Sequence, residues 1–155
     1  MTTVVHLRDV VNEMEVFDDD YHAFLNRVTG ELFTINRDEI RAIEEEDELK
    51  EYPAWQQDSI RKAGEILDSE DWLQLPSKFD IHEWGIMQDF CYSVDDERLR
   101  SELLDAIHGS GAFRHFKSTV HYRGIEQDWY RFRQNTLEQI AREWLEENEI
   151  PYTEA

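Results

Sequence analysis

The spacing of apolar residues constrains the fold of this chain more than any other feature of its sequence. Along most of the chain, apolar residues recur every three or four positions, as they do on one face of an α-helix. Residues 20–36 differ, because apolar and polar residues alternate there and aromatic and β-branched types favour a strand. The sequence therefore predicts a helix-dominated α+β fold, in which one N-terminal β-hairpin packs on a helical bundle.

Turn and capping residues divide this pattern into elements. Gly30 supplies the positive φ of a hairpin turn between strands expected near 20–27 and 31–36. Asp80, with Glu83 three residues later, has the spacing of a capping box, and Asp95 is expected to cap the next helix. Apolar residues at helical spacing predict helices over 4–16, 54–68, 81–91, 96–107, 113–120 and 125–148. The aromatic residues of these apolar faces, Trp55, Trp84 and Phe113 among them, are expected to pack into the core.

Two segments have no clear period. Residues 38–51 hold eight acidic and two basic residues, and are expected to form a solvated acidic helix or loop. Residues 71–78 are expected to form a loop whose apolar side chains fill the core. With a length of 155 residues and 12% aromatic residues, the chain can bury one core. We therefore expect a single domain over 1–155, with the hairpin near 20–36 and a helical body near 54–148.

The charge of the chain limits its partners. It has 36 acidic and 16 basic residues, which gives a formal net charge of −20. A negative field repels phosphate backbones and anionic membranes, which argues against nucleic-acid and membrane binding through the whole surface. The lone cysteine, Cys91, and the lack of an apolar leader or membrane span predict a cytoplasmic protein.

The sequence predicts no metal site and no cofactor. His82-Glu83 begins like a zinc-protease helix, but position 86 is Ile86, where the second histidine of that motif would stand. Cys91 lies within an apolar helical pattern, where a structural, unreactive thiol is expected. The glycines of Gly109-Ser110-Gly111 fit neither a dinucleotide fingerprint nor a P-loop, and are typical of a left-handed helix cap.

Basic residues concentrate in one stretch. Residues 112–142 carry six basic and three acidic residues, for a local charge of +3, while the rest of the chain carries −23. Arginine pairs with carboxylates and phosphates and stacks on aromatic rings. These side chains could bridge to acidic residues of the same chain or form a binding face. For a binding face, the candidate residues are Gly111, Arg114, Lys117, Arg131 and Arg133.

Several short motifs occur together in one order. They include Tyr21-His22-Ala23-Phe24-Leu25, Ile81-His82-Glu83-Trp84, Gly109-Ser110-Gly111-Ala112-Phe113, Phe116-Lys117, Trp129-Tyr130-Arg131-Phe132-Arg133 and Trp144-Leu145. In this order the chain resembles the uncharacterised bacterial protein family UPF0158. The resemblance implies a bacterial, cytoplasmic, single-domain protein, and it implies no activity, substrate or catalytic residue.

These observations favour a non-enzymatic interaction domain. It would bind a protein or a small anion through the face formed by residues 111–133. Two alternatives stay open. One is a hydrolase or transferase whose carboxylates converge only in three dimensions. The other is a regulator linked to nucleic acid, acting through the basic stretch or as an acidic mimic.

Overall fold

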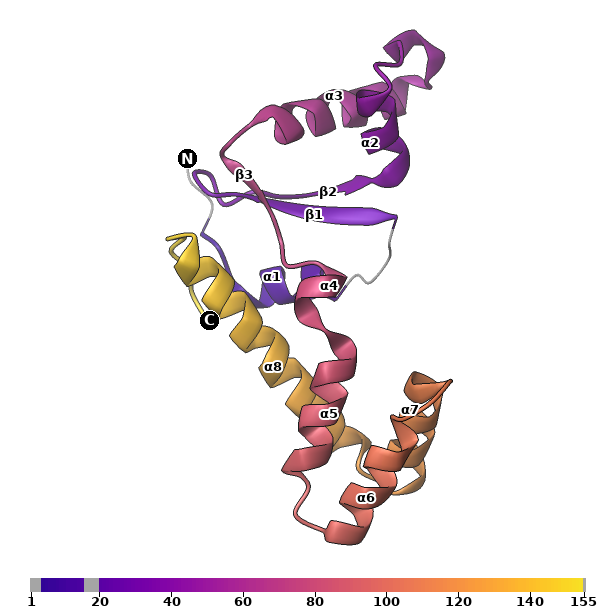
Figure 1. Ribbon diagram of the computed structural model, residues 1–155. Helices are drawn as coiled ribbons and strands as arrows, with labels where there is room; N and C mark the ends of the chain where they lie inside the picture. Colours follow the sequence, from indigo (N-terminus) through magenta and orange to yellow (C-terminus); the bar gives the residue numbers. More distant parts are fainter. Residues whose placement is uncertain (1–3, 16–19, 155) are drawn as a thin grey trace. The chain divides into compact units, whose positions relative to one another are not determined.

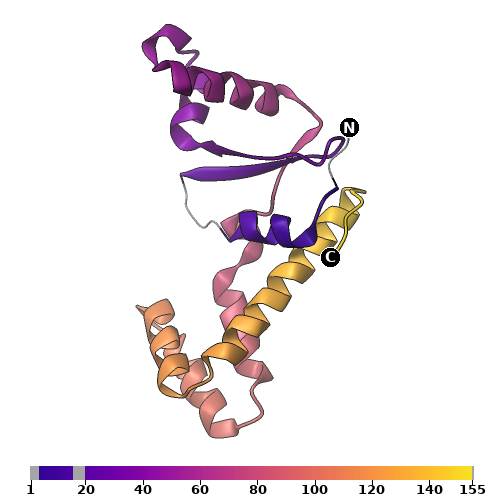
Figure 2. The same ribbon diagram turned by 180° about the vertical axis from the view of Figure 1, so that it is seen from behind.

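The computed structural model describes residues 4–15 and 20–154, and these form two compact units (Figures 1 and 2). The first unit spans Met1–Ser77 and Ala141–Ala155, and the second spans Lys78–Ile140. The helix-dominated α+β fold is confirmed by the helices and the one antiparallel sheet of the described residues. The expectation of a single domain over 1–155 stays a prediction.

The predicted hairpin is confirmed in the first unit. Strand β1 (Tyr21–Asn26) pairs antiparallel with β2 (Leu32–Asn36), and Phe24 stands opposite Phe33. The side-chain oxygen of Asn26 accepts hydrogen bonds from the backbone N–H groups of Val28 and Thr29 at 2.8 and 2.9 Å. Gly30 has φ +80°, the left-handed conformation that glycine adopts at no steric cost. The turn is therefore fixed by its own side-chain and backbone chemistry.

A third strand corrects the loop expected over 71–78. Strand β3 (Trp72–Gln74) pairs antiparallel with β1, which gives the sheet the order β2-β1-β3. Three residues are too few for an alternating pattern to stand out, and the strand forms because β1 offers a free edge. The rest of the segment has the expected irregular structure as far as the short helix α4 (Lys78–Ile81).

The two faces of the sheet carry different helices. On one face, Phe24 and Ile35 pack against Ala63 and Ile66 of helix α3, with α2 alongside (Figure 1). Thr34 points to the opposite face, where its hydroxyl donates to Glu13 of α1 at 3.1 Å. The bounds of these helices are α1 Leu7–Met14, α2 Arg37–Glu44 and α3 Ala54–Asp68, with a short 3₁₀ turn η1 at Leu49–Glu51.

The acidic segment 38–51 is helical in its first part, as expected, but one face of that helix, α2, is buried rather than solvated. The Asn36 side chain caps α2 by accepting from the backbone N–H of Glu39 at 2.8 Å. Its amide donates to the Glu39 carboxylate at 3.2 Å. Glu39 is buried, and burial raises the pKa of its carboxyl group. Ala42 is buried as well, so one face of this acidic helix belongs to the core.

Aromatic side chains form the core of the second unit. Phe90, Phe116 and Trp129 meet edge to face, with ring centroids 6.1 Å (Phe90–Phe116), 5.4 Å (Phe90–Trp129) and 4.8 Å (Phe116–Trp129) apart. Phe132 adds a fourth ring at 5.4 Å from Phe90. Such pairs add about 0.5–1.5 kcal/mol each beyond the area they bury. These rings come from α5 Glu83–Ser93, α7 Ala112–Tyr122 and the first part of α8 Glu126–Glu147, while α6 Glu97–Ala106, between α5 and α7 in the chain, buries Leu103.

Two predicted helix caps are wrong. Asp80 lies inside the short helix α4, and α5 instead begins after His82, which has φ +53° and no capping hydrogen bond from its side chain. Asp96, rather than Asp95, caps α6 by accepting from the backbone N–H groups of Arg98 and Leu99. Sequence alone does not separate two adjacent aspartates in this role, because either can reach the first turn.

Three aromatic residues assigned to the core are exposed instead. Trp55 is 73% exposed, Phe113 47% and Trp84 39%. Each is the second residue of its helix. Side chains on a helix lean toward its N-terminus, so a ring at this position extends past the end of the helix. Trp84 still donates its indole N–H to the carbonyl of Ile107 at 3.0 Å.

Two phenylalanines of α7 test this division between core and surface. We expect Phe116→Ala to lower the free energy of unfolding by about 3–5 kcal/mol, because Phe116 is fully buried among aromatic rings. The matched change Phe113→Ala should cost less than about 1 kcal/mol, because that ring is half exposed. Urea unfolding followed by tryptophan fluorescence measures both. Equal losses would contradict the packing described.

The end of α2 gives a second test. Glu46 has φ +54°, and its N–H donates to Ile43 while that of Asp47 donates to Ala42, as in a Schellman cap. Glu46→Gly should therefore raise the free energy of unfolding by about 0.5–1 kcal/mol. The neighbouring change Glu45→Gly removes the same charge from a residue at φ −85°, and should instead lower stability. Thermal or urea unfolding decides, and a stabilising Glu45→Gly would contradict the assignment.

Candidate functional site

Helix α7 lies at the centre of the longest stretch of the chain without an acidic residue. Residues 106–125 contain no Asp or Glu, although the chain has 36 of them in 155 residues. The same stretch carries three basic residues and three of the six histidines, namely Arg114, Lys117, Arg123, His108, His115 and His121. This part of the second unit therefore departs most from the acidic character of the chain.

The side chains of α7 divide into buried and exposed ones. Phe116 and Val120 are buried, whereas Phe113, Arg114 and Lys117 are exposed. Lys117 is three positions from Arg114 and four from Phe113, so its side chain neighbours both of them on the helix surface. Within the described part of the chain, neither Arg114 nor Lys117 forms an ion pair or a side-chain hydrogen bond. We call Phe113, Arg114 and Lys117 the α7 face.

Gly111 sets the start of this helix. It has φ +75°, and its carbonyl accepts the backbone N–H of His115 at 2.9 Å. A Cβ at this position would lie 3.4 Å from the His115 ring and 3.8 Å from the Arg114 guanidinium. Glycine therefore fits both the backbone conformation and the space beside these two side chains. The first turn of α7 also has no acidic residue and no side-chain cap.

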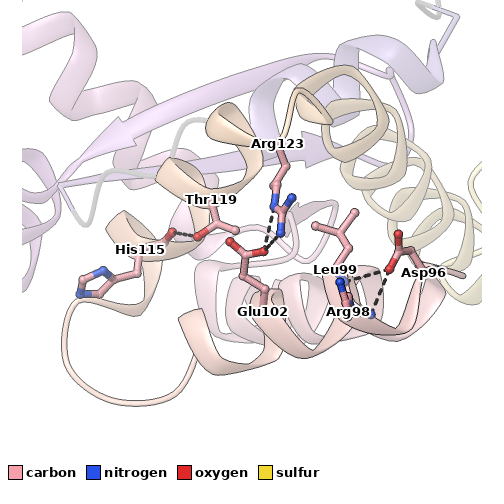
Figure 3. Close-up of polar contacts among 7 residues, drawn as sticks. All are labelled: Asp96, Arg98, Leu99, Glu102, His115, Thr119 and Arg123. Atoms are coloured by element: carbon pink, nitrogen blue, oxygen red, sulfur yellow. Dashed lines mark hydrogen bonds and ion pairs between the residues drawn. The ribbon is translucent and has the colours of Figure 1, made fainter.

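Arg123, after the end of α7, is held by an internal partner. Its Nε donates to Oε2 of Glu102 on α6 at 2.8 Å, and Nη2 contacts the same oxygen. Figure 3 shows the two side chains pointing toward each other between the helices, while the His115 ring points away from them. His121 likewise contacts Glu126. These two side chains serve contacts within the second unit.

The two candidate arginines of α8 differ from each other. Arg133 donates to Glu83 of α5 at 2.7 Å, and both side chains are about one-fifth exposed, at 20% and 22%. Arg131 is 73% exposed and lies 3.9 Å from Asp128, one turn earlier. Residues two positions apart on a helix point about 160° away from each other. Of the five candidate residues, Gly111, Arg114 and Lys117 lie together at α7. The Arg133 guanidinium is already paired with the Glu83 carboxylate.

The comparisons with known proteins identify a family. The uncharacterised protein family UPF0158 matches residues 2–154. The chain belongs to this family. A Pseudomonas aeruginosa protein named UPF0158 protein PA5073 is 37% identical over 67 residues, which cover 43% of this chain and 44% of that relative. The aligned part thus spans less than half of the relative's length. No solved structure matches the chain.

The described residues of this UPF0158 chain lack the features of a reactive cysteine, a metal cluster and a membrane-spanning helix. Cys91 is fully buried, and burial raises the pKa of its thiol to about 11, so the thiolate needed for nucleophilic attack is scarce at neutral pH. Among the residues that the structure describes, no three His, Cys, Asp or Glu side chains are grouped to hold a metal ion. No helix in the described ranges 4–15 and 20–154 combines the length and the apolar character needed to cross a bilayer.

The exposure of Phe113 is what sequence reasoning missed at this site. Phe113 keeps helical spacing with Phe116 and Val120, so the pattern placed all three in the core. A second signal was present, because the acid-free run 106–125 centres on this helix. That run would have drawn attention to α7 rather than to α8.

The difference between Arg133 and Arg131 can be measured. Arg133→Gln leaves the mostly buried Glu83 carboxylate without its cation, so we expect a loss of about 1–3 kcal/mol in the free energy of unfolding. Arg131→Gln should change stability by less than about 0.5 kcal/mol, because its pair is long and solvent-exposed. Adding Glu83→Gln to Arg133→Gln should recover part of the loss. Equal effects of the two arginine changes in urea unfolding would contradict the geometry.

Proposed function

We propose that this chain is a cytoplasmic, non-enzymatic interaction domain that binds an anionic partner through the α7 face. The partner is an acidic segment of another protein or a small anion. The observation that carries the proposal is the pair of exposed cations, Arg114 and Lys117, without internal partners among the described residues on a helix in an acid-free stretch. Ion pairs within the chain account for Arg123 and Arg133 but not for these two.

The distribution of charge along the chain favours the approach of an acidic partner near residues 106–125. The segment Lys78–Ile140 has eight basic and eleven acidic residues, while the remainder has eight basic and 25 acidic residues. An acidic ligand is therefore repelled by most of the chain and least repelled near residues 106–125. Oppositely charged patches raise the rate of encounter and fix the register of a complex.

The side chains of the α7 face supply short-range contacts. The Arg114 guanidinium can form a bidentate pair with a carboxylate or phosphate, and Lys117 adds a second cation one turn along. Phe113, 47% exposed, offers an aromatic surface of the type enriched at the centre of protein interfaces. This mixture suits an acidic peptide segment with an apolar side chain better than it suits a bare inorganic ion.

A binding experiment with matched charge changes tests the proposal. The variant Arg114→Glu/Lys117→Glu reverses both cations of the α7 face. The control Arg41→Glu/Arg61→Glu makes the same change in net charge on exposed residues of the first unit. The probes are a fluorescent acidic peptide of about 12 residues with one central Phe, inorganic phosphate, and single- and double-stranded oligonucleotides, over a range of NaCl concentrations.

We expect the wild-type chain to bind the acidic peptide and to lose affinity as salt screens the charges. The α7 variant should bind at least about tenfold more weakly, a loss of about 1.4 kcal/mol, while the control stays within about twofold. Equal peptide binding by the two variants, or none by the wild type, would overturn the proposal. Binding of oligonucleotides alone, with a steep salt dependence, would favour the nucleic-acid alternative instead.

A further inference from the structure

A pocket of about 500 Å³ lies in the first unit, apart from the α7 face. Its walls come from the start of the described chain (Val4 and Val5), the hairpin turn (Arg27 and Val28) and the segment after α8 (Ile150 and Pro151). Figure 1 shows the turn between β1 and β2 on the same side of this unit as the end of α8. Pockets of about 300–1,000 Å³ are the usual size for small ligands.

The walls are fixed by hydrogen bonds. The hairpin turn is held by the two bonds to the Asn26 side chain and by the bond from Gly30 N–H to the Asn26 carbonyl at 2.8 Å. The C-terminal segment runs alongside the N-terminal one, because Thr153 N–H donates to Val5 at 2.8 Å and Leu7 N–H donates to Thr153 at 2.9 Å. A pocket held in this way exists before a ligand binds, so its walls lose little conformational entropy on binding.

The lining is mostly apolar and partly open to solvent. Val5 and Ile150 are buried at 7% and 4% exposure, whereas Val4 and Val28 are 62% and 58% exposed. A ligand that covers these apolar side chains removes them from water, which contributes favourably to binding. The pocket therefore suits a ligand with an apolar body.

Arg27 is the one charged residue that lines the described pocket. Its Nε donates to Asp71 at 3.3 Å, and the two side chains are 50% and 49% exposed. Its backbone N–H also donates to the Asp71 carbonyl at 2.8 Å. Asp71 thus holds the residue in place through Nε, and no acceptor among the described residues takes a hydrogen bond from Nη1 or Nη2. These nitrogens are a natural site for a carboxylate.

We propose that this pocket binds a small amphipathic anion, namely an unbranched carboxylate of medium length. Its alkyl chain packs against Val4, Val28 and Ile150, and its carboxylate pairs with Arg27. This inference does not depend on the α7 face, since the pocket lies in the first unit and uses none of the residues of that face.

A ligand series on the full chain tests both halves of this arrangement. Hexanoate, octanoate and decanoate are titrated below their micelle concentrations, with decanol as the uncharged analogue. Binding is followed by backbone amide NMR shifts of Val28, Gly30 and Thr153. The variants are Arg27→Gln, Arg27→Lys and Val28→Asp, and Arg61→Gln is the matched surface control.

We expect saturable shifts at the pocket amides and an affinity that rises about three- to fourfold per methylene group. Decanoate should bind at least about tenfold more tightly than decanol. Arg27→Gln should abolish that preference, Arg27→Lys should keep part of it, and Val28→Asp should weaken decanoate by at least about tenfold. Circular dichroism checks that the variants stay folded. Non-saturable shifts, or equal decanoate binding by Arg27→Gln and Arg61→Gln, would overturn the proposal.

Discussion

The edge-to-face packing of Phe90, Phe116 and Trp129 decides which side of α7 meets solvent. Phe116 is fully buried in this cluster, so the helix cannot rotate without exposing a large apolar ring. Residues one or two positions away from Phe116 on the helix must then point outward. The cationic side chains Arg114 and Lys117 are on the surface for this reason. The candidate binding face is thus a consequence of core packing in the second unit.

The charge of the chain adds a second constraint. With a net charge of −20, the folded state carries strong self-repulsion, and each cation beside a carboxylate relieves some of it. Arg123 with Glu102, Arg133 with Glu83 and Arg142 with Glu154 are used in this way. Arg114 and Lys117 differ because no acidic residue occurs between 106 and 125, so the nearest sequence neighbours offer no carboxylate. Arg123 lies in the same run and reaches Glu102 of α6, so the lack of partners for Arg114 and Lys117 among the described residues reflects both the local composition and the direction in which these two side chains point.

The period of apolar residues was enough to predict most of the helices, the hairpin and the fold class, because burial of one face imposes that period directly. Features that depend on a neighbouring element were missed. Strand β3 exists only because β1 leaves an edge, and three residues show no period. Trp55, Trp84 and Phe113 keep the correct phase but stand second in their helices, where the packing partners end. Helical phase indicates direction around the axis, whereas burial also depends on position along it.

At the candidate site, the net charge of a sequence stretch likewise does not say which side chains share a surface. A local charge of +3 over 112–142 describes a stretch of sequence, but a ligand meets a surface. Arg131 and Arg133 are neighbours in sequence and point to different sides of α8, and Glu83, 50 residues away, neutralises one of them. Arg114 and Lys117 are three residues apart and share one side of α7. A cationic face is therefore best inferred from basic residues at helical spacing within a run that lacks acids, because both conditions act on the same surface.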